Sequence, residues 1–295
     1  MTYQETDTII ALSSGQGRAG IAVIRLSGPK SDDVLYHLTR KKLPETRKSA
    51  TRWVLSETGD KLDESLILRF KAPASFSGED MAEIHCHGSP AIVEEILSLA
   101  TSIGGVRHAQ RGEFSQRAFE NGKIDLLQAE GIADLIDADS SAQLKQAARF
   151  VAGDASGKIS EWRQSILEAS AFLAASIDFS DEGDVSDDVH APAIGILDGL
   201  ISEFGLAFEH AKSASRVRDG IRIAVLGKPN AGKSTLINAL SGRDAAIVSE
   251  IAGTTRDILE SHLIIAGVPV TIADTAGLRE TDDPIEAEGV KRARS

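Results

Sequence analysis

Alternating apolar and polar positions divide the first third of the chain into short strands and helices. An apolar run rich in β-branched residues at 20–28 (GIAVIRLSG) is closed by Ser-Gly-Pro, a pattern typical of a strand that leads into a turn. Two more strands are predicted at 65–70 (SLILRF) and 81–88 (MAEIHCHG). Helices are predicted at 31–38, which opens with a serine and two aspartates, and at 90–105, which begins with proline and ends with glycine.

From about residue 123 the apolar residues recur at the three- to four-residue spacing of a helix instead of alternating with polar ones. Long helical patterns cover 139–179 and 194–215, and an acidic stretch at 178–188 between them is predicted to be an exposed loop. This part of the chain is therefore predicted to be a helical domain with two or more long antiparallel helices. The apolar residues that mark its beginning are Ile124, Leu127, Ile132, Leu135 and Ile136.

A third pattern starts at Gly220. A continuous apolar strand (IRIAVLG) leads into a glycine-rich turn and a predicted helix at 233–240, and two further segments (HLIIAG and VPVTIAD) predict a β-hairpin before a second glycine turn. The last residues begin another helix, and the sheet is still small, so we expect the sequence to be part of a longer chain. The predicted fold is multidomain α/β: an α+β domain over 1–122, a helical domain over 123–216, and the first part of a further α/β domain over 217–295.

Composition narrows the classes of protein. The chain has 295 residues, of which 42% are hydrophobic and 26% charged, with a net charge of −12. This charge argues against a protein that binds nucleic acid with its whole surface. One basic cluster could still form a local binding patch, but a solvated face is the favoured interpretation of this cluster. The single cysteine, Cys86, fits a reducing compartment, and neither a secretion leader nor an unbroken membrane-length apolar run is visible, so a cytoplasmic protein is expected. The basic cluster comprises Arg40, Lys41, Lys42, Arg47, Lys48 and Arg52.

A phosphate-binding motif carries the strongest chemical signal. Residues 227–234 (GKPNAGKS) match the P-loop pattern GxxxxGK[ST] between a predicted strand and a predicted helix. Glycines let backbone N–H groups converge on phosphate oxygens, and the positive end of the helix dipole adds to the attraction. Lys233 is predicted to contact the β- and γ-phosphates, and the Ser234 hydroxyl to bind Mg²⁺.

Two later segments complete the pattern of a nucleotide-dependent switch. Residues 251–257 (IAGTTRD) supply a threonine that can complete the Mg²⁺ shell, and residues 274–277 (DTAG) follow an apolar strand. Asp274 can hold the metal through water, and the Gly277 N–H can face the γ-phosphate. The three motifs in this order predict a GTPase-type switch, although no guanine-reading NKxD segment follows Asp274 in this sequence.

The group that orients the attacking water is left open by these motifs. Many Ras-like proteins have a glutamine directly after the DxxG glycine, whereas this chain has Leu278, which has no hydrogen-bonding side chain. Within the P-loop, Asn230 is either a turn residue or a carbonyl ligand for a monovalent cation that supplies positive charge. The nearby candidates for orienting water are Arg279, Glu280, Asp282, Asp283, Glu286 and Glu288.

These motifs resemble the TrmE–Era subgroup of GTPases, and the N-terminal third narrows the resemblance. The segments GRAGIAVIRLSGP, SFSGEDMAEIHCHGSP and RGEFSQRAFENGKIDLLQAEGIADLIDA closely resemble the MnmE (TrmE) family of tRNA modification GTPases. The resemblance covers nearly the whole chain. It implies a folate-binding N-terminal domain that forms a homodimer, a helical domain, and a GTPase domain inserted within the helical one.

The resemblance also implies an activity and its partners. Members act with MnmG, a protein that carries FAD, in a heterotetramer that installs an aminomethyl-type group at C5 of the wobble uridine of certain tRNAs. The one-carbon unit comes from a 5-formyl- or 5,10-methylene-type tetrahydrofolate. GTP hydrolysis is stimulated when two GTPase domains pair across bound K⁺.

Site residues carry over from the family's motifs. The water-orienting glutamate falls on Glu286, the Mg²⁺ ligands on Ser234 and Thr255, and the folate-binding residues on Arg25, Glu83 and Lys123. The K⁺ ligands fall on Asn230, Ser249, Ile251 and Thr254. The nucleotide-binding residues fall on Asn230, Ala231, Gly232, Lys233, Ser234 and Thr235, on Ser249, Glu250, Ile251, Ala252, Gly253, Thr254 and Thr255, and on Asp274, Thr275, Ala276 and Gly277.

Other interpretations stay open beside this one. The family's guanine-reading motif, the closing helices of its helical domain and its C-terminal Cys-x-Gly-Lys motif are absent from this sequence. Two alternatives therefore stay open: an Era-type GTPase switch in ribosome assembly, or a folate-binding dimerisation fragment that does not turn over nucleotide. A metal site at His85, Cys86 and His87 is disfavoured, because alternate residues of a strand face opposite sides and zinc needs three or four ligands.

Overall fold

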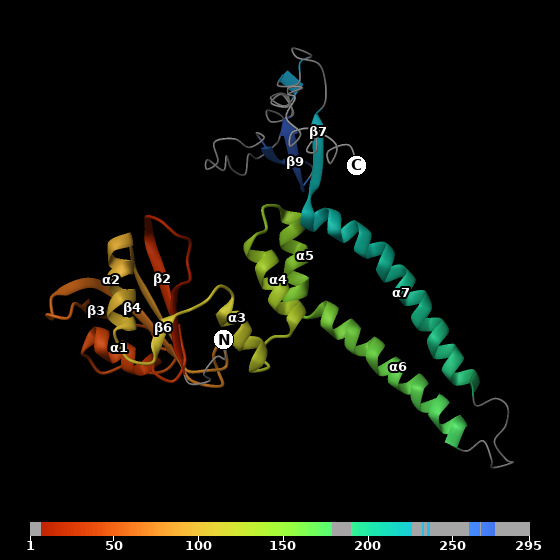
Figure 1. The fold of residues 1–295 in the computed structure, drawn as a ribbon, viewed down its shortest axis with the longest axis horizontal. Helices are drawn as coiled ribbons and strands as arrows, with labels where there is room; N and C mark the ends of the chain where they lie inside the picture. Colours follow the sequence, from red (N-terminus) through yellow and green to blue (C-terminus); the bar gives the residue numbers. More distant parts are fainter. Residues whose placement is uncertain are drawn as a thin grey trace, which may run out of the picture. The chain divides into compact units, whose positions relative to one another are not determined.

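A six-stranded mixed sheet organises the N-terminal part of the chain (Figure 1). The computed structural model describes residues 7–178, 190–225, 232, 235–236, 260–265 and 267–274, and the chain divides into two compact units, 1–129 and 130–295. In the first unit the strand order is β3-β4-β5-β2-β1-β6, antiparallel throughout except for the parallel β1/β6 pair. Its elements are β1 (Thr8–Leu12), β2 (Ala19–Ser27), α1 (Ser31–Thr39), β3 (Ala50–Leu55), β4 (Lys61–Phe70), β5 (Met81–Gly88), α2 (Pro90–Thr101), β6 (Val106–His108) and α3 (Glu113–Glu120).

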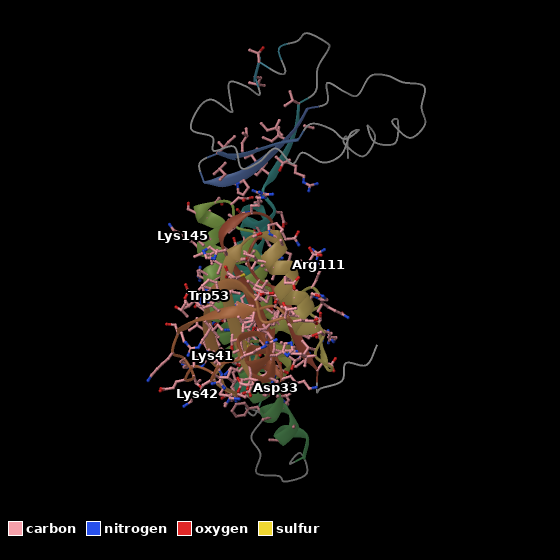
Figure 2. The ribbon with its side chains drawn as sticks, turned by 90° about the vertical axis from the view of Figure 1, so that its left-hand side faces the viewer. Asp33, Lys41, Lys42, Trp53, Arg111 and Lys145 are labelled. Atoms are coloured by element: carbon pink, nitrogen blue, oxygen red, sulfur yellow. The ribbon has the colours of Figure 1, made fainter. Side chains whose placement is uncertain are left out.

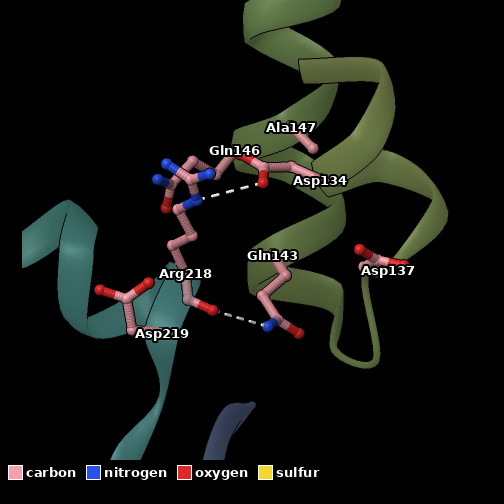
Figure 3. A pocket seen from close by; sticks show the side chains of 7 residues that line it. All are labelled: Asp134, Asp137, Gln143, Gln146, Ala147, Arg218 and Asp219. Atoms are coloured by element: carbon pink, nitrogen blue, oxygen red, sulfur yellow. Dashed lines mark hydrogen bonds and ion pairs between the residues drawn. The ribbon is translucent and has the colours of Figure 1, made fainter. Parts of the chain in front are cut away.

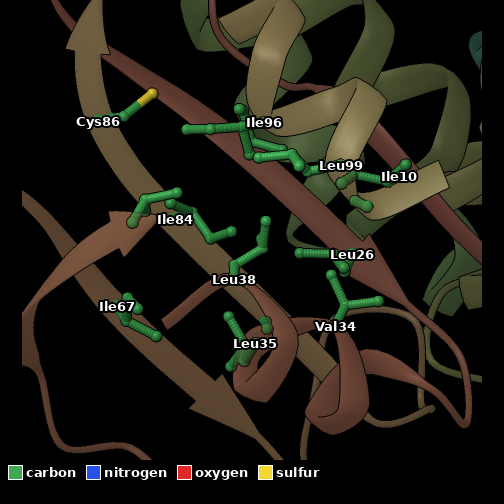
Figure 4. Packing of buried hydrophobic residues seen from close by; sticks show 14 of the residues in the cluster. Ile10, Leu26, Val34, Leu35, Leu38, Ile67, Ile84, Cys86, Ile96 and Leu99 are labelled. Carbon is green, nitrogen blue, oxygen red and sulfur yellow. The ribbon is translucent and has the colours of Figure 1, made fainter. Parts of the chain in front are cut away.

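The hydrophobic core lies between this sheet and helices α1 and α2 (Figure 4). Ile24 and Leu26 of β2 and Ile84 of β5 are fully buried against apolar side chains of the two helices. Because successive side chains of a strand point to opposite faces, the residues between these positions face the side away from α1 and α2. Arg25 and Glu83 are such residues.

The predicted elements of this unit are found, with changes in extent. The strand predicted at 65–70 is the second half of a longer strand, β4, and the helix predicted at 90–105 ends at Thr101. Strands β1, β3 and β6 and helix α3 were not predicted. β3 and β6 are short strands at the two edges of the sheet, and β6 has only three residues, too few for a repeating pattern to be visible.

Four helices follow: α4 (Leu126–Ile136), α5 (Ser141–Val151), α6 (Asp154–Asp178) and α7 (His190–Asp219). The helical pattern predicted over 139–179 forms two helices, α5 and α6, with a break at Gly153, whose φ of 86° favours glycine. The long helices α6 and α7 run side by side (Figure 1). The rings of Trp162 and Phe204 meet between them in a T-shaped contact, with centres 4.8 Å apart. The predicted acidic loop lies outside the described residues from 179 onward.

Helix α7 is long and apolar enough to span a membrane by length and composition alone. Its Glu203 carboxylate nevertheless accepts a hydrogen bond from the Trp162 indole of α6 and pairs with Lys158, at 2.7 and 2.9 Å. This long apolar helix therefore also makes polar side-chain contacts with α6.

A three-stranded sheet follows α7, in the order β7-β9-β8. It consists of β7 (Ile221–Val225), β8 (Glu260–Ile265) and β9 (Val268–Asp274). β8 and β9 form the predicted antiparallel hairpin, and β9 runs parallel to β7. The mixed α/β fold class predicted from the sequence is confirmed.

Candidate functional site

Two of the three residues assigned to folate lie directly opposite each other on neighbouring strands. Arg25 of β2 is in register with Glu83 of β5. The Arg25 Nε and Nη2 atoms both donate to Glu83 Oε1, at 3.0 and 2.8 Å, and the two side chains are 27% and 16% exposed. The other Glu83 oxygen, Oε2, lies 3.3 Å from His85 Nε2. Arg25 and Glu83 therefore form a partly exposed ion pair, the Arg25–Glu83 couple. It lies on the face of the sheet that α1 and α2 do not cover.

Two aromatic rings flank the Arg25 guanidinium. Its central carbon lies 5.4 Å from the centre of the Phe76 ring and 5.8 Å from that of Phe114, both within the range of a cation–π contact. Phe76 belongs to the loop between β4 and β5, and Phe114 to the first turn of α3. Neither ring was predicted as part of a site; the only signal in the sequence was their place in the SFSGED and RGEF segments.

A buried polar network holds this loop and helix in place. Glu113, 2% exposed, accepts hydrogen bonds from the Arg107 and Arg117 guanidinium groups and from the Gln110 backbone N–H. Arg117 also pairs with Glu79 at 3.0 Å, and Glu79 accepts a hydrogen bond from the Ser27 hydroxyl of β2 at 2.7 Å. The network thus links α3 and the Phe76 loop to the strand that carries Arg25.

Opposing effects act on the pKa of Glu113. Burial by itself would raise the pKa, but hydrogen bonds from Arg107 and the Gln110 backbone, the charge of Arg107, and the Arg117 side chain lower it below its usual value. The carboxylate is therefore ionised in its buried position at neutral pH.

Lys123, the third residue assigned to folate, lies beside the same loop. Its Nζ donates to the Pro73 carbonyl at 2.9 Å, and its side chain packs against Gly78. Gly78 has φ of 82°, and a Cβ there would lie 2.9 Å from Asn121 Cβ and 3.2 Å from Lys123 Cγ. Within the described residues no hydrogen bond or ion pair joins Lys123 to Arg25 or Glu83.

The three residues considered for metal are engaged separately. His85 contacts Glu83, and His87 Nδ1 lies 2.6 Å from Oδ1 of the buried Asp63. Cys86 is 3% exposed, in the core, and burial followed by the Asp63 charge raises the pKa of its thiol to about 11. Among the described residues no group of three His, Cys, Asp or Glu side chains is placed to hold a metal ion.

The basic cluster near residue 40 is partly engaged by its neighbours. Arg40 and Arg47 donate to backbone carbonyls at 2.7 and 2.9 Å, and Lys48 pairs with Glu45. Lys41 and Lys42 are exposed (Figure 2). These contacts favour the interpretation of the cluster as a solvated face.

Strands β7 and β9 end together. Their register pairs Ile221 with Val270 and Val225 with Asp274, so that the segments following both strands leave the same edge of the sheet. One segment is the P-loop, and the other is the DTAG motif. Gly232 of the P-loop has φ of 85° and accepts a helical hydrogen bond from the Leu236 N–H at 2.9 Å, and Thr235 and Leu236 are helical.

The other residues assigned to nucleotide and cations lie outside the described residues. Of Asp274 only the backbone is described. The remainder comprises Asn230, Ala231, Lys233, Ser234, Ser249, Glu250, Ile251, Ala252, Gly253, Thr254, Thr255, Thr275, Ala276, Gly277 and Glu286.

Side chains of α4 and α5 fix the end of the helix that leads into β7 (Figure 3). Gln143 Nε2 donates to the Arg218 carbonyl at 3.0 Å, and Arg218 Nε lies 3.1 Å from Asp134 Oδ1. These groups line a small cavity of about 200 Å³. Gly220, with φ of 72°, then turns the chain into β7. The beginning of the three-stranded sheet is thereby attached to the helical bundle.

Two family profiles and many relatives match the chain. A profile described as "GTP-binding protein TrmE N-terminus" matches residues 8–123, and one described as "MnmE helical domain" matches residues 126–291. The chain is 48% identical over 287 residues to the tRNA modification GTPase MnmE of Cereibacter sphaeroides, covering 97% of this chain and 66% of the relative. The proteins of the same name from Caulobacter vibrioides and Azorhizobium caulinodans are 49% and 51% identical, over 98% and 99% of this chain and 64% and 67% of theirs. The chain thus spans about two thirds of the length of these curated relatives.

Proposed function

This chain belongs to the MnmE (TrmE) family, and we propose from that premise that its protein hydrolyses GTP and takes part in the modification of tRNA. The finer proposal is that it acts with an MnmG-type FAD protein to install an aminomethyl-type group at C5 of wobble uridine. A 5-formyl- or 5,10-methylene-type tetrahydrofolate supplies the one-carbon unit. The protein works as a cytoplasmic homodimer within that heterotetramer.

The common edge of β7 and β9 is the observation that carries the GTPase proposal. Phosphates in α/β nucleotide sites bind outside the carboxyl ends of parallel strands, where helix N-termini and glycine-rich turns present backbone N–H groups. The register of Val225 with Asp274 supports one such site formed by the P-loop and the DTAG motif. The left-handed backbone at Gly232 and its helical hydrogen bond with the Leu236 N–H are consistent with a glycine turn that leads into a helix, as phosphate-binding loops do.

Each motif residue then has a role in hydrolysis. Lys233 binds the β- and γ-phosphates, Ser234 and Thr255 hold Mg²⁺, and the Gly277 N–H faces the γ-phosphate. Asn230, Ser249, Ile251 and Thr254 would hold K⁺, which would supply positive charge for the hydrolysis. Many Ras-like proteins orient the attacking water with a glutamine at the position of Leu278. In this protein Glu286 takes that role.

The Arg25–Glu83 couple supports the folate proposal. A carboxylate has about four acceptor positions, so Glu83 can accept further N–H donors of a pterin edge while it stays paired with Arg25. Arg25 uses only Nε and Nη2 for Glu83 among the described residues, which leaves Nη1 for a hydrogen-bond acceptor of the ligand. Lys123, on the exposed side of the Phe76 loop, is a second cation for the folate carboxylates.

The GTPase proposal is tested by turnover in K⁺ and in Na⁺. Full-length protein is expected to hydrolyse GTP faster in K⁺, and Glu286→Ala is expected to bind GTP normally but to hydrolyse it slowly. Equal turnover in the two salts contradicts the cation site, and normal turnover by Glu286→Ala contradicts the assigned role of Glu286.

The folate proposal is tested separately by calorimetric titration with 5-formyltetrahydrofolate. Arg25→Ala and Glu83→Ala are each expected to weaken binding by at least about tenfold, because each removes a charged hydrogen-bonding group from the ligand. Unchanged affinity in both variants shows that the folate site lies elsewhere.

A further inference from the structure

We infer that Phe76 and Phe114 form the aromatic contact surface on which the pterin ring of a tetrahydrofolate packs, beside the Arg25–Glu83 couple. The inference rests on the proposed folate site and adds to it two ring-contacting residues. Both approach the couple from outside the strands that carry it.

The two rings converge on one point from separate elements. Both ring centres lie within 6 Å of the same guanidinium carbon, at 5.4 and 5.8 Å, although Phe76 and Phe114 come from a loop and a helix. Both side chains are half-buried, whereas Phe119 of the same helix α3 is 47% exposed. Phe76 and Phe114 therefore turn towards Arg25, and Phe119 turns towards solvent.

The loop that carries Phe76 is fixed on both sides of the ring. Before it, Ser75 Oγ donates to the Glu79 carbonyl at 2.5 Å; after it, the hydroxyls of Ser77 and Ser27 lie 2.6 Å apart. Asn121 donates from Nδ2 to the Ser77 carbonyl at 2.8 Å. This loop contacts β2 and the end of α3 at once, so the ring position is set before any ligand binds, which lowers the entropy cost of binding.

The helix that carries Phe114 is fixed by its neighbouring residue. Glu113 is buried between Arg107 and Arg117, and Arg117 pairs with Glu79 of the Phe76 loop. In the first turn of α3, Glu113 thus holds the helix through its ion pairs, and the adjacent Phe114 faces Arg25.

The chemistry around the rings selects a flat heterocycle with N–H groups on one edge. In the register of the sheet Leu68 lies opposite Glu83, and Val23 lies opposite His85, so two apolar residues lie beside the couple on its own face. Flat aromatic rings pack on such surfaces with a preference for offset-stacked and edge-to-face geometry. Glu83 is the acceptor beside them, and a pterin presents donors on one edge of its ring system. The p-aminobenzoyl ring of the same ligand has no such edge, which assigns the pterin to the two phenylalanines.

Binding of 5-formyltetrahydrofolate to full-length protein tests this, measured by calorimetry for Phe76→Leu and Phe114→Leu. Each variant is expected to bind about 3- to 10-fold more weakly, the loss that corresponds to one aromatic pair. Phe76→Tyr and Phe114→Tyr keep a ring and are expected to bind within about twofold of wild type. Phe119→Leu is the matched control on the same helix and is expected to bind normally. A second ligand, p-aminobenzoylglutamate, lacks the pterin, and its affinity is expected to be the same in wild type and in the leucine variants.

Each outcome separates the inference from the proposed function. Wild-type affinity in the leucine variants, with loss in Arg25→Ala and Glu83→Ala, overturns the ring assignment and leaves the folate site standing. Unchanged affinity in all of these variants rejects the folate site and the inference together. Equal weakening of 5-formyltetrahydrofolate and p-aminobenzoylglutamate shows that the benzoyl ring occupies the surface, and overturns the assignment of the pterin.

Discussion

Removing the buried Glu113 carboxylate is the sharpest test of how the N-terminal sheet holds its loop and helix. The carboxylate accepts four hydrogen bonds, from Arg107 Nη1 and Nη2, the Gln110 N–H and Arg117 Nη2, at 2.9, 2.6, 2.7 and 3.2 Å. Its side chain is 1% exposed, so Glu113→Ala removes a buried carboxylate that two arginines share, and each arginine keeps one other acidic partner. Breaking a buried ion pair by removing one member costs about 3–5 kcal/mol.

The lower end of that range applies here. Arg107 is 32% exposed and keeps its ion pair with Asp7, and Arg117 keeps Glu79. We therefore expect Glu113→Ala to lower the free energy of unfolding of this unit by about 3 kcal/mol. Glu113→Gln keeps the volume and one acceptor oxygen but loses the charge, and is expected to cost about 1–2 kcal/mol.

The pH dependence of this loss has a definite sign. The folded-state pKa of Glu113 is lowered, so its stabilising contribution is present above the unfolded pKa of about 4.3 and is lost as pH falls through the folded value. The difference in stability between wild type and Glu113→Gln is therefore expected to be full at pH 7 and to shrink below about pH 4.3.

Urea unfolding measures this when one tryptophan reports on the sheet alone. The chain has two tryptophans, Trp53 in β3 and Trp162 in α6, so a Trp162→Phe background leaves only the reporter in the sheet. Glu120→Gln is the matched control, because this exposed residue of α3 bonds to Gln116 one turn away. A loss below about 1 kcal/mol in Glu113→Ala, or a difference that does not change with pH, would refute the argument that this network fixes α3.

Two further predictions concern the core and the helical bundle. Cys86 is buried, and burial raises the pKa of its thiol from 9.0 to about 11. At pH 8 the native protein is therefore expected to react with iodoacetamide at least about 100-fold more slowly than the unfolded protein, as measured by mass spectrometry. Comparable rates contradict the buried position of the thiol. In the bundle, Gly131→Ala places a Cβ 2.7 Å from Phe150 Cβ and 3.0 Å from the Val151 nitrogen, and is expected to destabilise the α4–α5 contact by about 1–3 kcal/mol. The control Gly157→Ala on α6 has no atom within 4 Å of the new Cβ and is expected to be neutral or slightly stabilising in thermal unfolding, and equal effects of the two changes contradict the close packing at Gly131.

The sequence by itself determined the elements whose pattern is local. The β8–β9 hairpin, strand β5 and helix α1 were predicted within a residue or two, because their alternation, caps and turn residues lie within the element itself. The P-loop and DTAG motifs were recognised for the same reason, since their chemistry requires fixed residues at fixed spacing. The expectation that Arg25 and Glu83 belong to one site came from resemblance, not from the alternation of β2 and β5.

Only the tertiary structure decided which distant residues meet. Arg25 and Glu83 are 58 positions apart and form an ion pair because β2 and β5 are neighbours in the sheet, and strand order is not encoded in either strand's own pattern. Phe76 and Phe114 reach the same guanidinium for a similar reason: a loop and a helix converge there through Glu79, Arg117 and Glu113. A buried carboxylate between two arginines cannot be distinguished in the sequence from a solvated one, because its burial depends on segments that are distant along the chain.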